Sequence, residues 1–129
     1  MNIGQAAAAS GVSAKMIRHY ESIGLIRESR RSDSGYRLYT DNDVHTLRFV
    51  KRARNLGFSL DQIRDLLSLW QDAGRASADV KTIALAHVAD LQKRIEELTE
   101  MRNTISELAH CCAGDQRPEC PILKGLAAD

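Results

Sequence analysis

Three cysteines, Cys111, Cys112 and Cys120, lie close together near the C-terminus. An odd number of clustered thiols in a short chain argues against a structural disulfide framework and favours metal binding, redox chemistry or catalysis. Gly114 and Pro118 allow the segment to bend back, so that the sulfurs of Cys112 and Cys120 could reach one ion. Thiolates select soft ions such as Cu(I), whereas Zn(II) normally takes four ligands. The segment therefore predicts a metal-binding loop with Cys112 and Cys120 as its ligands.

Two other chemistries stay open for these thiols. A zinc site would recruit His110 and Cys111, but consecutive residues at a helix end point about 100° apart, which strains such a site. A redox-active pair of Cys112 and Cys120 is the other alternative, although no Cys-x-x-Cys occurs on a βαβ pattern. The sequence contains no nucleotide-binding glycine motif, Ser-His-Asp set or carboxylate pair that would predict an enzyme.

The cationic side chains concentrate in the first half of the chain. Residues 1–55 contain ten Lys and Arg against five Asp and Glu, whereas residues 56–129 contain eight against twelve. This segregation predicts a polyanionic partner for the first half, and Lys, Arg and Tyr suit the phosphates and sugars of DNA. A DNA-bending structural protein without a ligand is a further alternative. The residues expected to contact DNA lie on one helix and one hairpin: Lys15, Arg18, His19, Tyr20, Arg31, Tyr36 and Arg37.

The elements that carry these cations form a winged helix-turn-helix domain over residues 1–70. Two short helices, over about 3–9 and 14–23, are joined by a turn containing Gly11, which is the helix-turn-helix layout. The turn-forming residues of 32–35 predict a small β-hairpin, or wing. Two further helices are expected from their N-capping residues, from Thr40 to about Leu56 and from Ser59 to about Trp70.

Residues 77–110 predict a long helix, because apolar residues repeat in heptads and no Gly or Pro interrupts them. Such a helix spans about 50 Å, which exceeds the diameter of the small domain before it. A partner helix from a second subunit would cover the apolar stripe, and a helix folded back on its own domain is the alternative. Residues 111–129 then form the thiol loop and a short C-terminal segment, so the fold is mainly α.

No apolar run exceeds four residues, whereas a membrane-spanning helix needs about 20. The first residues lack the basic region and the apolar stretch of a signal peptide, so the cytoplasm is the expected location.

The chain carries a set of short motifs along nearly its whole length: Met1–Gly4, Ser13–Arg18, Tyr20-Glu21, Ile23–Ile26, Ser34–Arg37 and Ala53–Phe58. Together they resemble the MerR family of bacterial transcription regulators. The loop from Cys112 to Ile122, taken with Ser77–Lys81, resembles the branch of that family that responds to copper, silver or gold.

This resemblance implies a homodimer with two winged DNA-binding domains joined by a long antiparallel coiled coil of dimerisation helices. One monovalent ion, Cu(I), Ag(I) or Au(I), would be bound linearly by Cys112 and Cys120 at each end of the coil. Ser77 would approach from the other subunit, where divalent-ion sensors of the family carry Cys, and Lys81 would offset the residual negative charge. The doubled Cys111-Cys112 resembles gold-responsive relatives.

The resemblance also implies how the protein would act. The family binds promoters whose −35 and −10 elements are too far apart, and metal binding makes the dimer bend and untwist the spacer for RNA polymerase. The expected DNA contacts fall on positions that the family uses, and His19 stands where the family usually has an aromatic residue. The sequence thus predicts a metal-responsive activator that acts on double-stranded promoter DNA.

Overall fold

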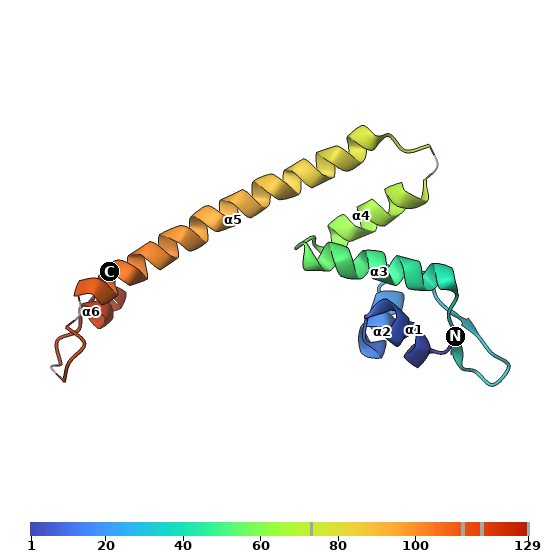
Figure 1. The fold of residues 1–129 in the computed structure, drawn as a ribbon, viewed down its shortest axis with the longest axis horizontal. Helices are drawn as coiled ribbons and strands as arrows, with labels where there is room; N and C mark the ends of the chain where they lie inside the picture. The colour runs from blue at the N-terminus through green and yellow to red at the C-terminus, as the bar shows by residue number, and fades with distance from the viewer. Residues whose placement is uncertain (73, 112, 117, 129) are drawn as a thin grey trace. The chain divides into compact units, whose positions relative to one another are not determined.

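The computed structural model describes residues 1–72, 74–111, 113–116 and 118–128. The predicted ligand Cys112 lies outside the described residues. Within these ranges the chain forms six helices and one two-stranded hairpin (Figure 1). The chain divides into two compact units, Met1–Ile83 and Ala84–Asp129. This mainly helical architecture with a small wing and one long helix confirms the fold class expected from the sequence.

The first two helices form the expected helix-turn-helix. Helix α1 (Ile3–Ser10) begins at the N-cap residue Asn2 and ends at Gly11, whose φ of 75° is left-handed and therefore suits glycine. Helix α2 (Ala14–Ser22) begins at Ser13, whose side chain accepts a hydrogen bond from a backbone N–H in the first turn.

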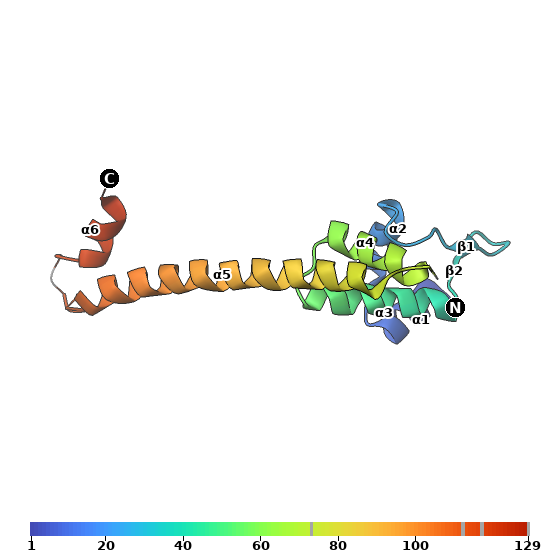
Figure 2. The ribbon, with the colours of Figure 1, turned by 90° about the horizontal axis from the view of Figure 1, so that it is seen from above.

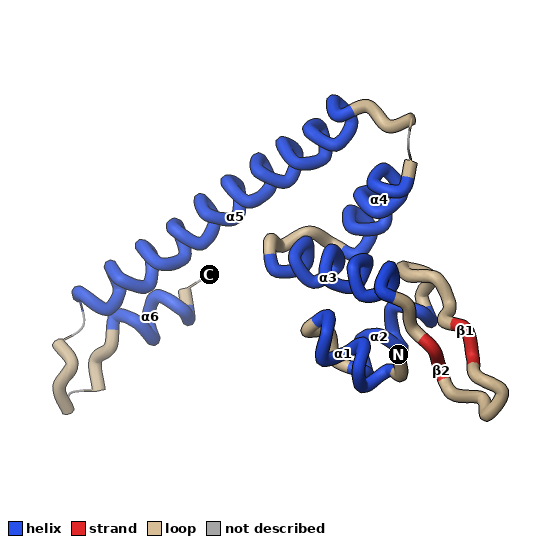
Figure 3. Tube along the Cα trace, turned by 45° about the vertical axis from the view of Figure 1, so that its right-hand side comes forward, coloured by secondary structure: helices blue, strands red, loops and turns tan. Residues whose placement is uncertain are grey.

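The wing is a short antiparallel hairpin of two strands, β1 (Arg30–Arg31) and β2 (Arg37–Leu38), drawn in red in Figure 3. Arg31 pairs with Arg37 in its register. Gly35 has a φ of 84°, a conformation that an L side chain rarely adopts, and it completes the turn between the strands.

The first unit also contains helices α3 (Asp41–Asn55) and α4 (Leu60–Gln71), and each begins with a capping box, as the sequence predicts. The largest fully buried side chains of the unit come from α2, α3 and α4: Ile17, Leu47, Val50 and Ile63.

The last large apolar residue of α4 lies at the edge of the core. Trp70 shares an apolar face of the helix with Ile63 and Leu67, but 42% of the residue remains exposed. Its ring stacks on Phe49 of α3 at a centroid separation of 4.7 Å and an interplanar angle of 8°. Trp70 therefore covers α3 at the edge of the unit and does not fill the centre of the core.

Helix α5 (Ser77–Cys111) has 35 residues, or a length of about 52 Å, and ends one residue beyond the prediction (Figure 2). A short helix, α6 (Pro121–Ala127), was not expected, and it lies beside the end of α5. A Cβ atom at Gly125 would meet Leu108 Cδ2 at 2.7 Å, so the two helices approach closely here and a larger residue at 125 would require the Leu108 side chain to shift. No helix in the described ranges is long and apolar enough to cross a membrane.

Candidate nucleic-acid interface and thiol loop

The outer face of α2 is cationic because its apolar residues point the other way. Ile17 and Tyr20 are buried in the core of the first unit, one helical turn apart. The other face of α2 carries Lys15, Arg18 and His19, which are exposed. Tyr20 is only 5% exposed, so its main role in the structure is to pack in the core. The structure thus gathers three of the four expected contact residues of α2 on its outer face.

The wing presents a second polar surface. Tyr36 at its tip is 72% exposed, and its backbone carbonyl accepts a 2.7 Å hydrogen bond from the N–H of Ser32. The Arg31 guanidinium donates a 3.0 Å hydrogen bond to the carbonyl of Gly35, which braces the turn. An exposed tyrosine ring beside two arginines is the combination that contacts phosphates and sugars.

Glu21 joins the wing to α2. Its side chain is only 4% exposed, and its carboxylate lies 3.5 Å from Nε of Arg37. The hydroxyl of Tyr39 donates to the same carboxylate at 2.5 Å, and the hydroxyl of Ser29 donates at 3.4 Å. Sequence patterns did not assign a role to Glu21, because its partners are 8 to 18 positions away in the chain. Its position beside the hairpin becomes visible only in the folded unit.

A second buried carboxylate, Asp43, holds the segment that follows α2. Arg27 donates to both of its oxygens, at 2.8 and 3.2 Å, and the backbone N–H of Thr40 donates at 2.8 Å. Burial alone would raise the pKa of Asp43, but the hydrogen bonds from Arg27 and Thr40 outweigh burial and lower this pKa below its ordinary value of 3.8. Asp43 is therefore held as a carboxylate in the folded unit.

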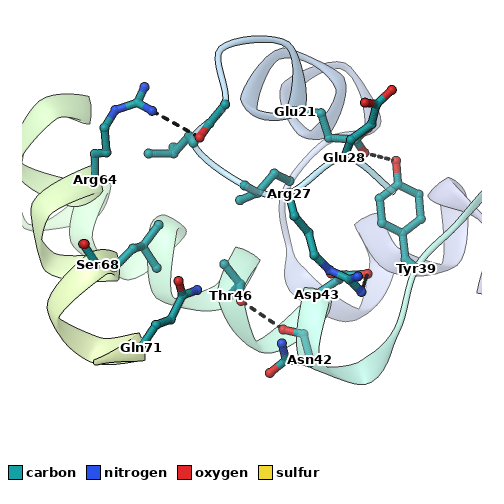
Figure 4. Close-up of a pocket in the computed structure, with 14 residues that line it drawn as sticks. Glu21, Arg27, Glu28, Tyr39, Asn42, Asp43, Thr46, Arg64, Ser68 and Gln71 are labelled. Carbon is teal, nitrogen blue, oxygen red and sulfur yellow. Dashed lines mark hydrogen bonds and ion pairs between the residues drawn. The ribbon is translucent and has the colours of Figure 1, made fainter. Parts of the chain in front are cut away.

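The Glu21–Tyr39 and Arg27–Asp43 pairs line a hollow of about 630 Å³. The hollow lies between the end of α2, the segment that follows it, α3 and α4 (Figure 4). Arg64 of α4 donates to the carbonyls of Ile23 and Gly24 at 3.0 and 3.1 Å, and thereby satisfies acceptors at the C-terminal end of α2. Figure 4 shows Tyr39 and Glu21 at one side of the hollow and Arg64 at the other. These contacts fix the orientation of α2 from two directions.

The thiol loop connects α5 to α6. Cys111 is the exposed last residue of α5, and Cys120 is the half-buried N-cap residue of α6. Gly114 adopts a left-handed φ of 68°, which helps the chain to reverse direction. Because α6 packs on Leu108, the reversal returns the chain to the last turns of α5. Among the described residues no group of three or more His, Cys, Asp or Glu is placed to hold a metal ion.

The two residues expected near the ion from the partner subunit lie at the start of α5. Ser77 is its first residue, and Lys81 follows about one turn later. Both side chains are exposed. They belong to the first unit, whereas the thiol loop belongs to the second.

Two family models match the chain. One is described as "MerR HTH family regulatory protein" and matches residues 1–70, and the other, "MerR, DNA binding", matches residues 44–108. Together they cover the helix-turn-helix, the wing and most of α5.

Curated proteins and solved structures are similar over nearly the whole chain. The heavy metal-dependent transcription regulator 2 of Rhizobium meliloti (strain 1021) is 58% identical, with 98% of this chain and 86% of that protein covered. The HTH-type transcriptional regulator CueR of Escherichia coli O157:H7 is 42% identical, with 98% of this chain and 94% of that protein covered. The crystal structure of the transcription regulator PbrR691 from Ralstonia metallidurans CH34 in complex with lead(II) matches with a TM-score of 0.86 and a sequence identity of 31%. The match covers 98% of this chain and 99% of that chain.

Proposed function

The chain belongs to the MerR family of HTH regulatory proteins, and from that premise we propose that it is a heavy-metal-responsive regulator of transcription. Its relatives are transcription regulators and not enzymes. The observation that carries the proposal is the cationic outer face of α2 beside a wing with an exposed tyrosine, all on one compact unit. The expected location of such a regulator is the cytoplasm, where promoter DNA is accessible.

DNA binding is proposed for the first unit, within a functional domain of residues 1–70. A helix of this size fits the major groove, and a cationic wing beside it can contact the adjacent backbone. The proposed contact residues are those expected from the sequence: Lys15, Arg18, His19, Tyr20, Arg31, Tyr36 and Arg37. Because Tyr20 is only 5% exposed, any contact that it makes with DNA would use a small part of its surface.

Residues 77–110 are proposed to form the dimerisation helix, in an antiparallel coiled coil with a second copy. The support is a series of large apolar side chains on α5 that are more than half exposed in the single chain: Leu85, Val88, Ile95, Leu98, Met101 and Ile105. A second helix would remove this surface from water, which stabilises the pair by about 25 cal/mol per Å².

Residues 111–129 are proposed to hold the inducing ion, with Cys112 and Cys120 as ligands. The half-buried Cys120 at the start of α6 and the return of the chain to the end of α5 support a closed loop at this point. Two thiolates leave a net charge of −1 around a monovalent ion, and Lys81 of the partner subunit would offset that charge. We therefore propose Cu(I), Ag(I) or Au(I) as the inducer.

Cys112 and Cys120 would hold the ion, which when bound would supply a positive charge between the two thiolates. We propose that this change in the loop alters the dimer so that the bound DNA spacer is bent and untwisted, and that RNA polymerase responds through the DNA. In this proposal Ser77 of the partner subunit lies near the ion, where a divalent ion would need a third thiolate, so a serine at this position favours a monovalent inducer.

A divalent-ion sensor is the second candidate. The observation that favours it is the likeness to PbrR691, whose crystal structure contains lead(II) and which has the same fold over 98% of this chain. A site for such an ion would recruit Cys111 or a side chain of the partner subunit as an additional ligand.

The proposal is tested with single serine variants of the three cysteines. We expect Cys112→Ser and Cys120→Ser to abolish metal-induced transcription while the affinity for DNA changes less than about twofold, because the loop lies outside the DNA-binding unit. Cys111→Ser is the matched control and should respond as the wild type does. The duplex for all binding measurements is the one that the wild-type protein selects from a random-sequence pool.

The outcomes separate the two candidates. Native mass spectrometry of the anaerobic dimer should give one Cu(I) or Au(I) per loop and no retained Zn(II) or Pb(II). Retention of a divalent ion that depends on Cys111 would establish the second candidate. If the wild type selects no duplex, the DNA-binding proposal itself is wrong.

A further inference from the structure

Glu21 is a carboxylate in a position that local rules disfavour. It is the penultimate residue of α2, where the helix dipole opposes a negative charge, and its side chain is 4% exposed. A buried carboxylate costs free energy unless it is hydrogen-bonded and paired. In such a case the group that breaks the local preference often serves a site beyond its own helix.

The groups that stabilise this carboxylate come from the wing and its two flanks. Arg37 lies in β2, Tyr39 follows β2, and Ser29 precedes β1. The hydroxyls of Tyr39 and Ser29 donate to Glu21 and the Arg37 guanidinium forms an ion pair with it, so the base of the hairpin is fixed to α2 at one point. The nitrogen of Met1, just before α1, also donates to the carbonyl of Tyr39 at 2.9 Å.

The contact with Arg37 has a further consequence for the side chain itself. A guanidinium has five N–H donors in a planar fork, and Nε of Arg37 lies 3.5 Å from a carboxylate oxygen of Glu21, in an ion pair. The two terminal nitrogens carry the remaining four donors. A side chain whose Nε is held in this way loses less conformational freedom when its terminal nitrogens bind a phosphate or a base.

We propose that Glu21 is a positioning residue for DNA binding, which orients Arg37 and the wing relative to α2 before the DNA arrives. This inference rests on the proposed DNA-binding function of the first unit. A carboxylate would by itself repel the phosphates, so Glu21 acts through Arg37 and does not contact DNA.

The test is a double-mutant cycle of Glu21→Gln and Arg37→Ala, measured by fluorescence anisotropy with the selected duplex at several salt concentrations. Glu21→Gln keeps the size of the side chain and removes its charge. We expect it to weaken binding about tenfold, the loss typical of one oriented charge-assisted contact. In the Arg37→Ala background the same change should cost less than about twofold, because no side chain remains to be positioned.

A purely structural role would give a different pattern. Glu21→Gln would then weaken binding by the same factor in both backgrounds, and that additivity would overturn the proposal. Asp43→Asn is the matched control, since Asp43 is also a buried, arginine-paired carboxylate of this unit and its partners Arg27 and Thr40 lie outside the wing. We expect this control to change the affinity less than about twofold while it lowers the unfolding temperature.

Arg37→Lys gives an independent measurement that does not require Glu21→Gln to fold. Lysine keeps the charge but lacks the fork that can meet Glu21 and DNA together. We expect Arg37→Lys to bind within about threefold of Arg37→Ala, with a salt slope reduced by about one. Wild-type affinity of Arg37→Lys would overturn the inference. Loss of salt-dependent binding by the wild type would instead show that the proposed function is wrong.

Discussion

The phenol of Tyr39 donates a 2.5 Å hydrogen bond to the carboxylate of Glu21, and so ties the residue after the wing to the C-terminal turn of α2. Burial of the ring, and then this hydrogen bond to Glu21, raise the pKa of Tyr39 above its ordinary value of 10.0. The folded unit therefore favours the neutral phenol more strongly than the unfolded chain does.

This relationship predicts a loss of stability at alkaline pH. The contribution of Tyr39 is fully present below the unfolded-state pKa of about 10 and is lost as the pH rises through the higher folded-state value. Tyr39→Phe should cost about 1 kcal/mol near pH 7 through the lost hydrogen bond, and its stability should decline less above pH 10. Urea denaturation across this range measures both effects. Tyr36→Phe, at an exposed tyrosine, should keep the wild-type slope, and an unchanged slope in Tyr39→Phe would contradict the assignment.

The Arg27–Asp43 pair predicts the opposite dependence at acid pH. Because the pKa of Asp43 is lowered from 3.8, its contribution is present above that value and is lost as the pH falls through the folded-state pKa. Arg27→Ala should destabilise the unit by about 1 kcal/mol at pH 7, a value reduced by the exposure of half of the Arg27 side chain. The difference from wild type should shrink in thermal melts below pH 3.8. Arg94→Ala, which breaks the exposed pair with Asp90, is the control and should change stability by less than about 0.5 kcal/mol.

Arg18 on the outer face of α2 should contribute directly to DNA affinity. We expect Arg18→Ala to weaken binding of the selected duplex by about 1–3 kcal/mol, because a charge-assisted contact to a phosphate or base is lost. Gel-shift titration measures the change. Arg102→Ala removes an exposed arginine of α5 and is the matched control for net charge. Equal affinities for the two variants would exclude Arg18 from the interface.

Ser77 predicts the selectivity of the proposed metal site. If residue 77 of the partner faces the ion, Ser77→Cys adds a third thiolate, and the site gains a ligand and a charge that suit a divalent ion. We expect a new transcriptional response to zinc, cadmium or mercury, with part of the Cu(I) response retained. Ala78→Cys adds a thiol at the neighbouring exposed position and should leave selectivity unchanged. In metal competition on the purified dimer, Ser77→Cys should likewise bind the divalent ions more tightly than Ala78→Cys does. Equal divalent-ion affinities of the two variants would remove residue 77 from the site.

The apolar stripe of α5 predicts a dimer that one charge can break. Leu98 is 62% exposed in the single chain, and its burial in a coiled coil is worth about 1.5–3 kcal/mol per copy. Leu98→Lys should shift the protein to monomer in sedimentation equilibrium at micromolar concentration. Gln92→Lys places the same charge outside the heptad stripe and should remain dimeric. A dimeric Leu98→Lys protein would mean that this face does not form the interface.

The helices of the first unit could be predicted because each carries its own local signals. Ser13, Thr40 and Ser59 are N-cap residues whose side chains accept backbone hydrogen bonds, and Gly11 ends α1 in a left-handed conformation. These signals lie within a few residues of the helix ends they define, so the sequence displays them directly. The long helix α5 was predicted from its heptad pattern of apolar residues and from the absence of Gly and Pro over residues 77–110.

The contacts that orient the candidate site were not predictable in this way. Glu21 has partners up to 18 positions away, and Arg64 contacts Ile23 from 41 positions away, so no local sequence pattern predicts either contact. Helix α6 was not predicted because Gly125 has a low helix propensity, and its close approach to Leu108 becomes visible only in the folded chain. The exposure of Trp70 was not predictable, because the period of α4 identifies an apolar face but not how far the core extends along it.

The two hydrogen bonds from Arg64 to the end of α2 have a mechanical consequence. Two hydrogen bonds from one planar guanidinium resist rotation about either of them, so they couple a displacement of α4 to the C-terminal end of α2. Helix α4 precedes α5 in the chain, so a displacement of α4 that accompanies a change in α5 would reach α2 through these two hydrogen bonds. A small rotation of α4 would then displace the cations on the outer face of α2.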